Sequence, residues 1–406
     1  MRIVAALVLL AGGCAGQDFT QRGFLDVRLF AFPQRAANDS SHAVGEALLR
    51  YEVSRVVWRG LRLHGNLDAR TDTHHQTERS ARLDWQERSL QRPAVSIRRV
   101  SAVYSRAGIT TEIGKQFVRW GKTDILTPTD RFAPRDFLAV VDNDFFGIPA
   151  VRVMWERGPL TLDAVWQVRF TPSRAPLPNQ RWTVVPEQAR LLTIHDLGAV
   201  NPGGTAVGLR ANYVGSGFDA AVSVYDGWNH LPLLEARVEA APLVIGVRRI
   251  YPQLRMYGAD GSVPLRWFSV KGETAWFRSA TRAADEYVHY VVQLERTSGE
   301  WVFVGGYGGE HVAERRSSLR FAPDRGLTSA FLGRASYTID VNRSVAFEAA
   351  VRRTGDGVWL RGEYSHALGQ HWRATAGVTL IRGELTDFLG QYRRNSHADL
   401  AVRYSF

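Results

Sequence analysis

The end of the chain alternates between apolar and polar side chains up to its last residue. Between residues 396 and 406 every second residue is apolar, at Ala398, Leu400, Val402, Tyr404 and Phe406. A period of two predicts a β-strand, because successive side chains of a strand point to opposite faces. One unbroken apolar face beside one charged face suits a strand that lies between lipid and a water-filled lumen. An edge strand of a soluble sheet is the alternative.

The aromatic end of this strand also predicts a partner. Phe406 has apolar residues two, four and six places before it, the first of them Tyr404. This arrangement resembles the signal by which the barrel assembly machinery of the outer membrane recognises its substrates. We therefore expect Tyr404 and Phe406 to act as an assembly signal.

Alternating segments fill the rest of the chain from residue 24 onward. Residues 160–169 and 372–380, for example, alternate over about ten residues, the length of a strand that crosses a membrane. No internal segment has the roughly 20 apolar residues of a membrane helix. Only helices and closed barrels satisfy every backbone hydrogen bond in lipid. The sequence therefore predicts an all-β fold, a single transmembrane antiparallel β-barrel in the outer membrane.

Short and long connections alternate along this series of segments, as short periplasmic turns and longer external loops do in outer-membrane barrels. The pattern predicts about 18 strands, within a range of roughly 16 to 20, and the number must be even. Strand pairs near Leu83 or Leu233 could be missing from this count. The short turns are expected at residues 58–60, 105–108, 157–159, 214–217, 259–264, 297–300, 340–342 and 368–370. The long links are expected at 33–42, 73–93, 121–146, 171–203, 227–249, 311–326 and 385–395, with two short external links at 280–285 and 354–357.

The first 16 residues have the composition of a signal peptide. Arg2 precedes an apolar run over residues 3–11, and small residues follow that run. The single cysteine, Cys14, fits a lipobox in which it becomes the lipidated first residue of the mature protein. Cleavage by signal peptidase near Ala15 or Gly16, which would remove Cys14, is the alternative. We expect residues 17–406 to form the barrel without a disulfide and without a separate domain.

The basic balance of the chain restricts the classes of partner. The formal net charge is +11, and lysine occurs only at Lys115, Lys122 and Lys271, so almost all the positive charge is arginine. A basic chain suggests nucleic acid, anionic surfaces or anionic solutes, although a genome rich in arginine codons gives the same bias. The absence of a basic run and of a nucleic-acid motif excludes nucleic acid. The expected partners are outer-membrane lipid, lipopolysaccharide and small solutes; the sequence shows no interface that decides for or against a homo-oligomer.

The stretch 112–146 has the most distinctive composition in the chain. A predicted strand leads into a loop, 121–146, that is dense in charges of both signs and contains Pro128 and Pro134. Proline stiffens a loop, and a stiff, charged loop inside a barrel can set its narrowest point. We expect this loop to fold into the lumen; a loop that caps the barrel from outside is the alternative. The candidates for the pore constriction are Lys115, Arg119, Lys122, Asp124, Asp130, Arg131, Arg135 and Asp136.

Short motifs in the same stretch resemble a known family. The pattern is Gly-Lys-Gln-x-x-x-Trp-Gly followed by a Thr-Pro-x-Asp loop, and it falls on Gly114, Lys115, Gln116, Trp120, Gly121, Pro128 and Asp130. It resembles a group of porin-like outer-membrane barrels of Gram-negative bacteria. Residues 272–277 are similar to a later hairpin of that family. The resemblance implies a barrel that acts in solute passage or in the export of hydrophobic compounds.

Parity within the alternating segments separates a charged face from an apolar face on each strand. Arginines and acids interleave on the charged face, which we expect to line the lumen. Opposite charges on neighbouring strands can simply hold the wall together, or they can form a transverse field that filters polar solutes with a modest preference for anions. The lumen-lining candidates are Arg62, Asp68, Arg70, Arg152, Arg169, Arg210, Lys271, Glu273, Arg361, Arg373 and Arg403.

Signals for other kinds of site are weak. His74 and His75 have no carboxylate or cysteine at ligand spacing beside them, so we expect no metal site. The glycine-rich stretch 305–309 interrupts a strand pattern, where glycine lets the wall bend or a loop approach closely. We expect no cofactor and no enzymatic activity. The sequence predicts a porin-like channel for passive passage of small solutes; a barrel with a structural or export role, and a barrel enzyme, are the alternatives.

Overall fold

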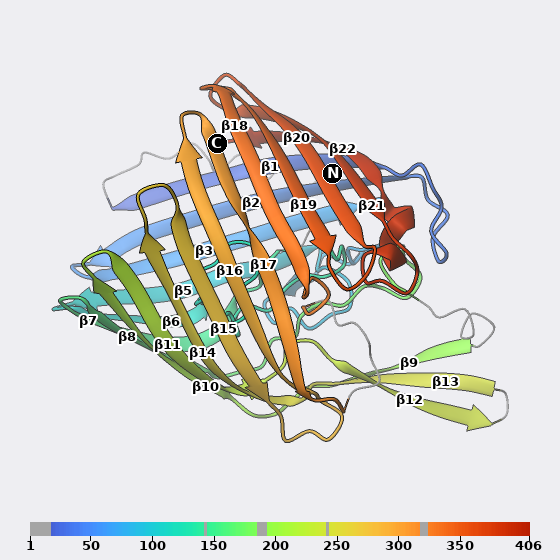
Figure 1. Cartoon of the computed structure of the whole chain (residues 1–406), viewed down its shortest axis with the longest axis horizontal. Coiled ribbons are helices and arrows are strands. Elements are labelled where there is room, and N and C mark those ends of the chain that lie inside the picture. Colours follow the sequence, from blue (N-terminus) through green and yellow to red (C-terminus); the bar gives the residue numbers. More distant parts are fainter. Residues whose placement is uncertain (1–17, 142–143, 185–192, 241–242, 317–323) are drawn as a thin grey trace.

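The computed structural model describes residues 18–141, 144–184, 193–240, 243–316 and 324–406 (Figure 1). Cys14 and the predicted signal peptide lie outside the described residues. Eighteen strands form a closed antiparallel barrel, in which each strand pairs with the next along the chain and the last pairs with the first. The predicted fold class and strand number are confirmed.

The strands of the wall are consecutive in the chain except where β4, β9, β12 and β13 intervene. The first half of the wall consists of β1 (Phe19–Ala31), β2 (Ala43–Trp58), β3 (Leu61–Asp72), β5 (Val95–Arg106), β6 (Ile109–Gln116), β7 (Ile148–Arg157), β8 (Leu160–Gln167), β10 (Ala206–Gly215) and β11 (Phe218–Trp228). The second half consists of β14 (Gln253–Pro264), β15 (Ser269–Arg278), β16 (Glu286–Ser298), β17 (Trp301–Glu314), β18 (Ala330–Asp340), β19 (Arg343–Arg352), β20 (Val358–Leu368), β21 (Trp372–Arg382) and β22 (His397–Ser405).

The wall turns its apolar side chains outward. Along β11, Val222 is 62% exposed and Val224 is 44% exposed, whereas Ser223 between them is 4% exposed. The same alternation places Trp276 of β15 outside and Glu273 inside. An apolar outer face with polar groups inside is the reverse of a soluble protein, and lipid around the barrel is the environment that stabilises it.

One of the predicted short turns is wrong. The turn expected at residues 259–264 is part of β14, which continues to Pro264, and the chain reverses at Leu265, whose N–H donates to the carbonyl oxygen of Phe268 at 2.9 Å. The stretch has turn composition because it contains Asp260 and Gly261. Asp260 is nevertheless a strand residue that faces inward, where Arg210 donates to its carboxylate at 2.8 Å.

Three strands lie outside the wall. β9 (Thr193–Val200), β12 (Leu233–Ala240) and β13 (Leu243–Ile250) form a small sheet that projects beyond the long-loop end of the barrel (Figure 1). β4 (Leu83–Asp84) is a two-residue strand beside β5. The strands near Leu83 and Leu233 therefore exist but do not enlarge the barrel. In the described part of the chain, a 3-10 helix (Gly390–Asn395) ends the last loop, and no helix is long and apolar enough to cross a membrane.

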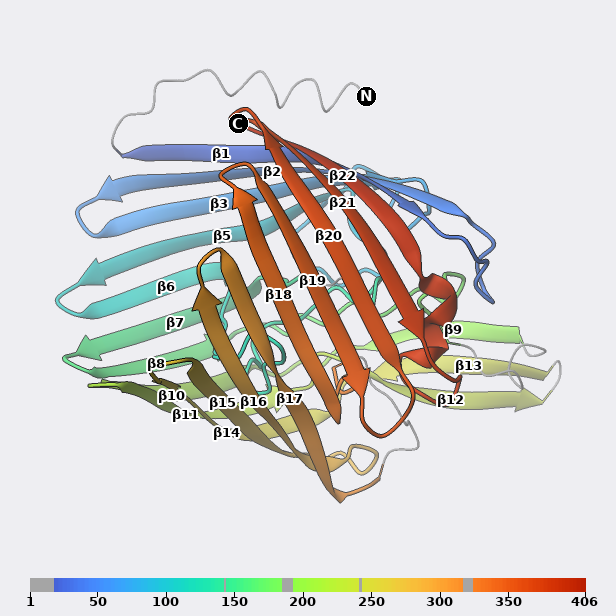
Figure 2. The ribbon, with the colours of Figure 1, turned by 45° about the horizontal axis from the view of Figure 1, so that its top comes forward.

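β1 and β22 close the barrel, and both chain ends of the wall lie at the short-turn end (Figure 2). Past the paired strands, the N–H of Gly23 donates to the carbonyl of Phe406 at 2.8 Å, and the N–H of Phe406 donates back to Gly23 at 2.9 Å. A Cβ atom on Gly23 would lie 2.6 Å from the Phe406 ring. Glycine at this position therefore lets the terminal ring lie against β1.

Deleting Phe406 should sharply lower the amount of folded barrel in the outer membrane. The deletion removes the predicted assembly signal together with two backbone hydrogen bonds at the seam, each worth about 1 kcal/mol. Gly23→Val is the companion variant, because it displaces the ring and leaves the terminal residue in place. Heat-modifiable mobility of outer-membrane fractions on gels measures both. Unchanged levels of the deletion variant would refute the assembly role, and a defect in Gly23→Val alone would assign the effect to closure.

Candidate pore and its internal segments

Residues 117–147 connect β6 to β7 and form what we call the inner segment. At one end of the segment, side chains of β15 and β16 accept hydrogen bonds from its backbone. At the other end, arginines of β2, β3 and β5 contact Asp144. All these wall side chains belong to the face opposite the apolar exterior. The inner segment therefore lies inside the barrel and spans most of its width.

Glu273 of β15 holds the first turn of the inner segment. Its carboxylate, in a side chain that is 3% exposed, accepts hydrogen bonds from the N–H and hydroxyl groups of Thr123 and Thr129 and from the N–H of Lys122, at 2.7–3.2 Å. Next to it, Gln293 of β16 accepts hydrogen bonds from two further backbone N–H groups of the segment. A buried carboxylate with several donors is stable because each charge-assisted bond offsets part of its lost hydration.

Glycines of β17 make room for the same turn. A Cβ atom on Gly306 would lie 2.8 Å from Cδ1 of Ile125, and one on Gly308 would lie 2.4 Å from Cδ1 of Leu126. Any side chain at these positions would push the turn away from the wall. Of the two reasons expected for the glycine-rich stretch, the structure shows the close approach of a loop.

An apolar cluster fills the space between the inner segment and one side of the wall. Trp120 and Phe132 of the segment pack edge-to-face at a centroid distance of 5.1 Å, and Phe132 packs on Tyr225 of β11 at 5.0 Å. The indole N–H of Trp120 donates to Asp163 at 2.9 Å, and Arg152 pairs with the same carboxylate at 2.7 Å. The other buried members come from β7, β8, β10, β14, β15 and β16 and the segment itself: Val118, Ile148, Ala150, Val165, Ala206, Leu254, Met256, Ala275, Phe277 and Tyr287.

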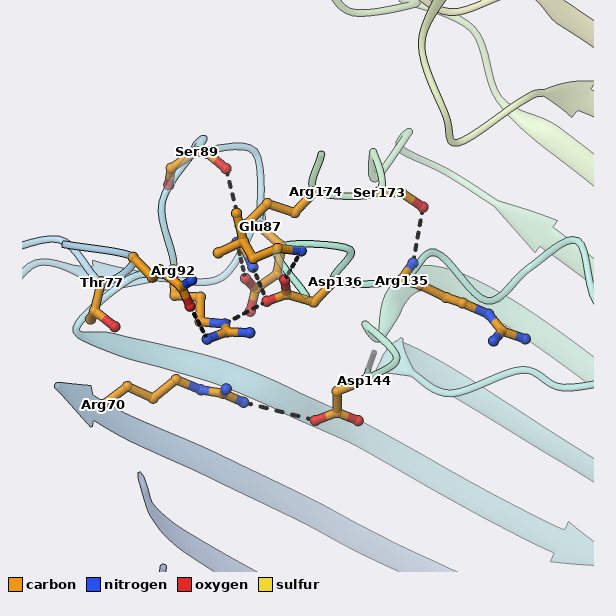
Figure 3. Close-up of polar contacts among 12 residues, drawn as sticks. Arg70, Thr77, Glu87, Ser89, Arg92, Arg135, Asp136, Asp144, Ser173 and Arg174 are labelled. Atoms are coloured by element: carbon orange, nitrogen blue, oxygen red, sulfur yellow. Dashed lines mark hydrogen bonds and ion pairs between the residues drawn. The ribbon is translucent and has the colours of Figure 1, made fainter. Parts of the chain in front are cut away.

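Asp136 is the charged centre of the middle of the inner segment (Figure 3). Its carboxylate, 3% exposed as a residue, accepts hydrogen bonds from Arg92 at 2.8 Å and from Arg174 at 3.0 Å, and Arg174 also pairs with Glu87 at 3.0 Å. Burial by itself raises the pKa of Asp136, but Arg92 and Arg174 together hold that pKa well below its usual range. Arg174 belongs to residues 168–184, a second inner segment that follows β8. Asp136 therefore ties three connections together.

Asp130 differs from Asp136 in the direction in which its pKa is shifted. Its buried carboxylate accepts hydrogen bonds from Arg119 at 2.9 Å and from the N–H of Trp120 at 3.3 Å. Burial raises the pKa of Asp130 despite the nearby charges of Arg119 and Arg135. The pKa of the Arg135 guanidinium is lowered to about 10, chiefly by burial.

Asp144 joins the end of the inner segment to the wall. Its carboxylate pairs with Arg98 at 2.6 Å and lies 3.4 Å from Arg50 and 3.8 Å from Arg70. Asp68, 1% exposed, pairs with the same Arg50 and Arg70 at 2.7 and 2.8 Å. Burial raises the pKa of Asp144, and the surrounding arginines lower it below its usual value.

Two cavities lie on the other side of the lumen, along the seam between β1 and β22. Their volumes are about 430 and 270 Å³. The inner segment contributes Ala139 and Val141 to the larger cavity and Asp144 to the smaller one. The two cavities share the lining residues Asp26, Arg28, Glu46, Arg92 and Arg403, so they adjoin one another. A second apolar cluster borders the larger cavity. In it, Val140 of the inner segment and Trp182 of the second inner segment pack with Phe388 of the last loop and with residues of β19 and β21.

The predicted constriction residues lie beside this space and not in it. In the described part of the chain, none of the eight lines either cavity. Lys115 is 2% exposed, and its ammonium donates to the carbonyl of Ile97 at 2.6 Å. Lys122 pairs with Asp219, and Asp124 pairs with Lys271 at 2.9 Å. Arg131 lies 3.8 Å from Asp324. Their effect on the width of the pore stays a prediction.

The predicted lumen-lining residues fall into three groups. Arg70, Arg361, Arg373 and Arg403 line the cavities. Asp68, Arg152, Arg210, Lys271 and Glu273 contact the inner segment or the side chains that hold it; Arg210, for example, donates to the carbonyl of Trp120. Arg62 faces inward on β3 without lining either cavity, and Arg169 is an exposed residue just past the end of β8.

Sequence reasoning missed the second inner segment. Arg174, Arg181 and Trp182 come from the link after β8, which was expected to be an external loop. Glu87 and Arg92 come from the link between β3 and β5, which was also expected to be external. Arg181 is 5% exposed and lies over the Phe32 ring at 3.6 Å. The available signal was the mixture of charged and aromatic residues in links too long for simple turns.

Solved structures of similar architecture include bacterial outer-membrane proteins. OccK9 (OpdG) from Pseudomonas aeruginosa aligns with a TM-score of 0.56 and 12% identity, a BenF-like porin from Pseudomonas fluorescens Pf-5 with 0.54 and 10%, and OpdQ from P. aeruginosa with 0.53 and 10%. Each alignment covers 96% of this chain and 98% of the other. The sequence matches no protein-family model and no curated protein. The chain thus has the fold of outer-membrane porins.

Replacing Glu273 with Gln should loosen the inner segment. The amide offers one acceptor oxygen where the carboxylate offers two, and each charge-assisted hydrogen bond contributes about 1.5–3 kcal/mol. Trypsin reports the change, because Arg119, Lys122, Arg131 and Arg135 are cleavage sites within the segment. We expect the folded wild type to resist cleavage there and the variant to be cut. Glu295→Gln, an inward-facing control on β16 that pairs with Lys271 at 2.8 Å, should stay resistant. Equal resistance of Glu273→Gln would contradict the assignment.

Replacing Asp136 with Asn should lower the free energy of unfolding by about 3–5 kcal/mol at neutral pH, because buried Arg174 and half-buried Arg92 lose the carboxylate that they share. The folded pKa of Asp136 lies below the 3.8 of the unfolded chain, so its contribution is complete above that value and fades as pH falls below it. Urea unfolding at three pH values measures this: the difference from wild type should be constant between pH 7 and about pH 5 and shrink below about pH 4. Asp340→Asn, at an exposed turn, should change little; a difference that shrank already at pH 6 would contradict the pKa direction.

Proposed function

We propose that the protein is an outer-membrane channel through which small solutes diffuse passively. The observation that supports this most directly is the pair of adjoining cavities along the inner face of the seam, lined by charged side chains. The apolar exterior places the wall in lipid, and the closed ladder leaves the lumen as the one route for a polar solute. One of the similar folds is named a porin.

We assign the narrowing of this route to the inner segment. It meets the open space through Ala139, Val141 and Asp144. The predicted constriction residues would then act indirectly: Asp130 with Arg119, and Asp136 with Arg92, fix the path of the backbone that carries those three residues. A rigid internal segment of this kind sets the size limit of a pore, because it does not swing aside for a large solute.

The structural and enzymatic alternatives have less support. A barrel without a pore would need a filled lumen. Two cavities along the seam stay open beside the two apolar clusters. The acids and arginines beside the seam pair with one another, which suits a polar wall. We therefore propose passage of solutes in preference to catalysis or export of hydrophobic compounds.

Single-channel recording in a planar bilayer tests the proposal. The purified, folded protein should give steady openings, and Ala139→Trp should lower the conductance by about half or more, because an indole ring fills much of the larger cavity. Ala220→Trp is the matched control, since Ala220 is exposed on the outer face of β11. A folded protein that never conducts would refute the channel. Equal conductance of Ala139→Trp and wild type would place the route elsewhere.

A further inference from the structure

The walls of the two cavities carry almost no net charge, although the chain as a whole carries +11. Eight arginines of the described chain line the cavities: Arg28, Arg50, Arg70, Arg92, Arg181, Arg361, Arg373 and Arg403. Seven carboxylates line them as well: Asp26, Glu46, Asp72, Asp144, Glu348, Glu363 and Asp399. The excess of basic residues over acidic residues therefore lies outside this route.

The charges beside the seam are also interleaved, so that no face of the larger cavity has one sign. Asp26 of β1 pairs with Arg403 of β22 at 2.5 Å and with Arg28 at 3.1 Å. Arg361 of β20 pairs with Asp399 of β22 at 2.9 Å and with Glu363 at 3.2 Å. Opposite charges this close cancel within a few ångströms, which leaves a wall of alternating donors and acceptors.

The remaining carboxylates of the lining are satisfied too. Glu46 lies 3.4 Å from Arg92, Glu348 lies 3.3 Å from Arg334, and Asp144 pairs with three arginines. Asp72 accepts hydrogen bonds from backbone N–H groups of residues 74–77 at 2.5–3.1 Å. Within the described residues, Arg373 is the one lining arginine that makes no ion pair. Its neighbour across the ladder is Arg403, a like charge.

A charged solute gains little in such a wall. To bind an arginine here, an anion must compete with the carboxylate already paired to it, and it must give up its own hydration. A polar solute without net charge loses less hydration and can bond donors and acceptors side by side. Trp182 and Trp359 also line the larger cavity, and their rings can contact the apolar faces of such a solute.

We propose that this route selects polar solutes without net charge, and that Arg373 supplies the small anion preference that remains. This inference rests on the channel function proposed above. The basic composition of the chain then does not set the selectivity of its pore, because the lining arginines other than Arg373 are paired with carboxylates.

The reversal potential in a potassium chloride gradient gives the first test. The permeability ratio of chloride to potassium should lie between about 1 and 3, the effect of a single unpaired cation in a screened lumen. A ratio clearly above about 3, or a preference for potassium, would overturn the proposal while leaving the channel function intact. A silent bilayer would instead refute the channel function.

Three substitutions in the lining and one control on the outer face locate the effect. Arg373→Gln should bring the permeability ratio to about 1, and Asp26→Asn, which leaves Arg28 and Arg403 without their carboxylate, should raise it by about twofold or more. Glu363→Gln, at a less buried position of the same network, should move the ratio in the same direction as Asp26→Asn. It replaces Asp26→Asn in the test if that variant folds poorly. Arg255→Gln removes a charge from the outer face of β14 and should change nothing. If Arg373→Gln and Glu363→Gln both leave the ratio unchanged, the cavities beside the seam are not the conducting route.

The second test compares three solutes of similar size that are neutral, anionic and cationic. Liposomes that contain the protein should swell fastest in glucose and more slowly in gluconate, an anion, and glucosamine, a cation, by about threefold or more after osmolarity is matched. Faster swelling in gluconate than in glucose would show that the arginines act as free cations, and the proposal would fail. Equal rates for all three would show that the wall does not discriminate by charge, which would also overturn it.

Discussion

Closure of the ladder between β1 and β22 is the constraint on which the rest of the structure depends. Lipid offers no hydrogen-bond partners, so a wall with an open edge would leave rows of N–H and carbonyl groups unsatisfied. The register from Phe24 with Ser405 to Ala31 with Ala398, extended by Gly23 and Phe406, removes that edge. Once the wall is closed, it has an inside, and long connections can fold there with their polar groups satisfied by inward-facing side chains. Glu273, Asp136 and Asp144 can only act as anchors because closure shields them from lipid.

The inner segment is held by two kinds of force, one on each side of the lumen. Towards β7 to β16, Trp120 and Phe132 pack in an apolar cluster that resembles the core of a soluble protein. Towards β2, β3 and β5, Asp144 is held by Arg50, Arg70 and Arg98 in a network of ion pairs. Apolar packing fills space, whereas paired charges keep water-accessible surface beside them. The smaller cavity lies beside these ion pairs, whereas a second apolar cluster, which includes Val140 and Trp182, borders the larger cavity.

The wall could be predicted from the sequence because each strand carries its own period-two signal. Asp260 shows the limit of that signal. It lies in a stretch of turn-like composition, but the ladder pairs it with Ala221 and Glu273, and Arg210, 50 residues away in sequence, pairs with its inward-facing carboxylate. The interior was harder to predict, since inward-facing Tyr225 and Phe277 contradict the rule that a lumen is polar and their reason lies in the inner segment. Arg174 and Arg181 belong to a link without period, so nothing local placed them inside. The candidate constriction residues stood out by their charge, but their spacing did not reveal that Lys115, Asp130 and Asp136 are buried.

The position of the cavities against the seam has a consequence for biogenesis. Their walls come from β1 to β3 and from β19 to β22, the first and the last strands of the chain, whereas the filled side comes from strands in between. The filled side can reach its final packing before the two ends of the chain meet. The open side acquires its second wall only when β22 joins β1. A partly assembled barrel would thus have a packed apolar side but no closed pore, and permeability would arise in the final step of folding.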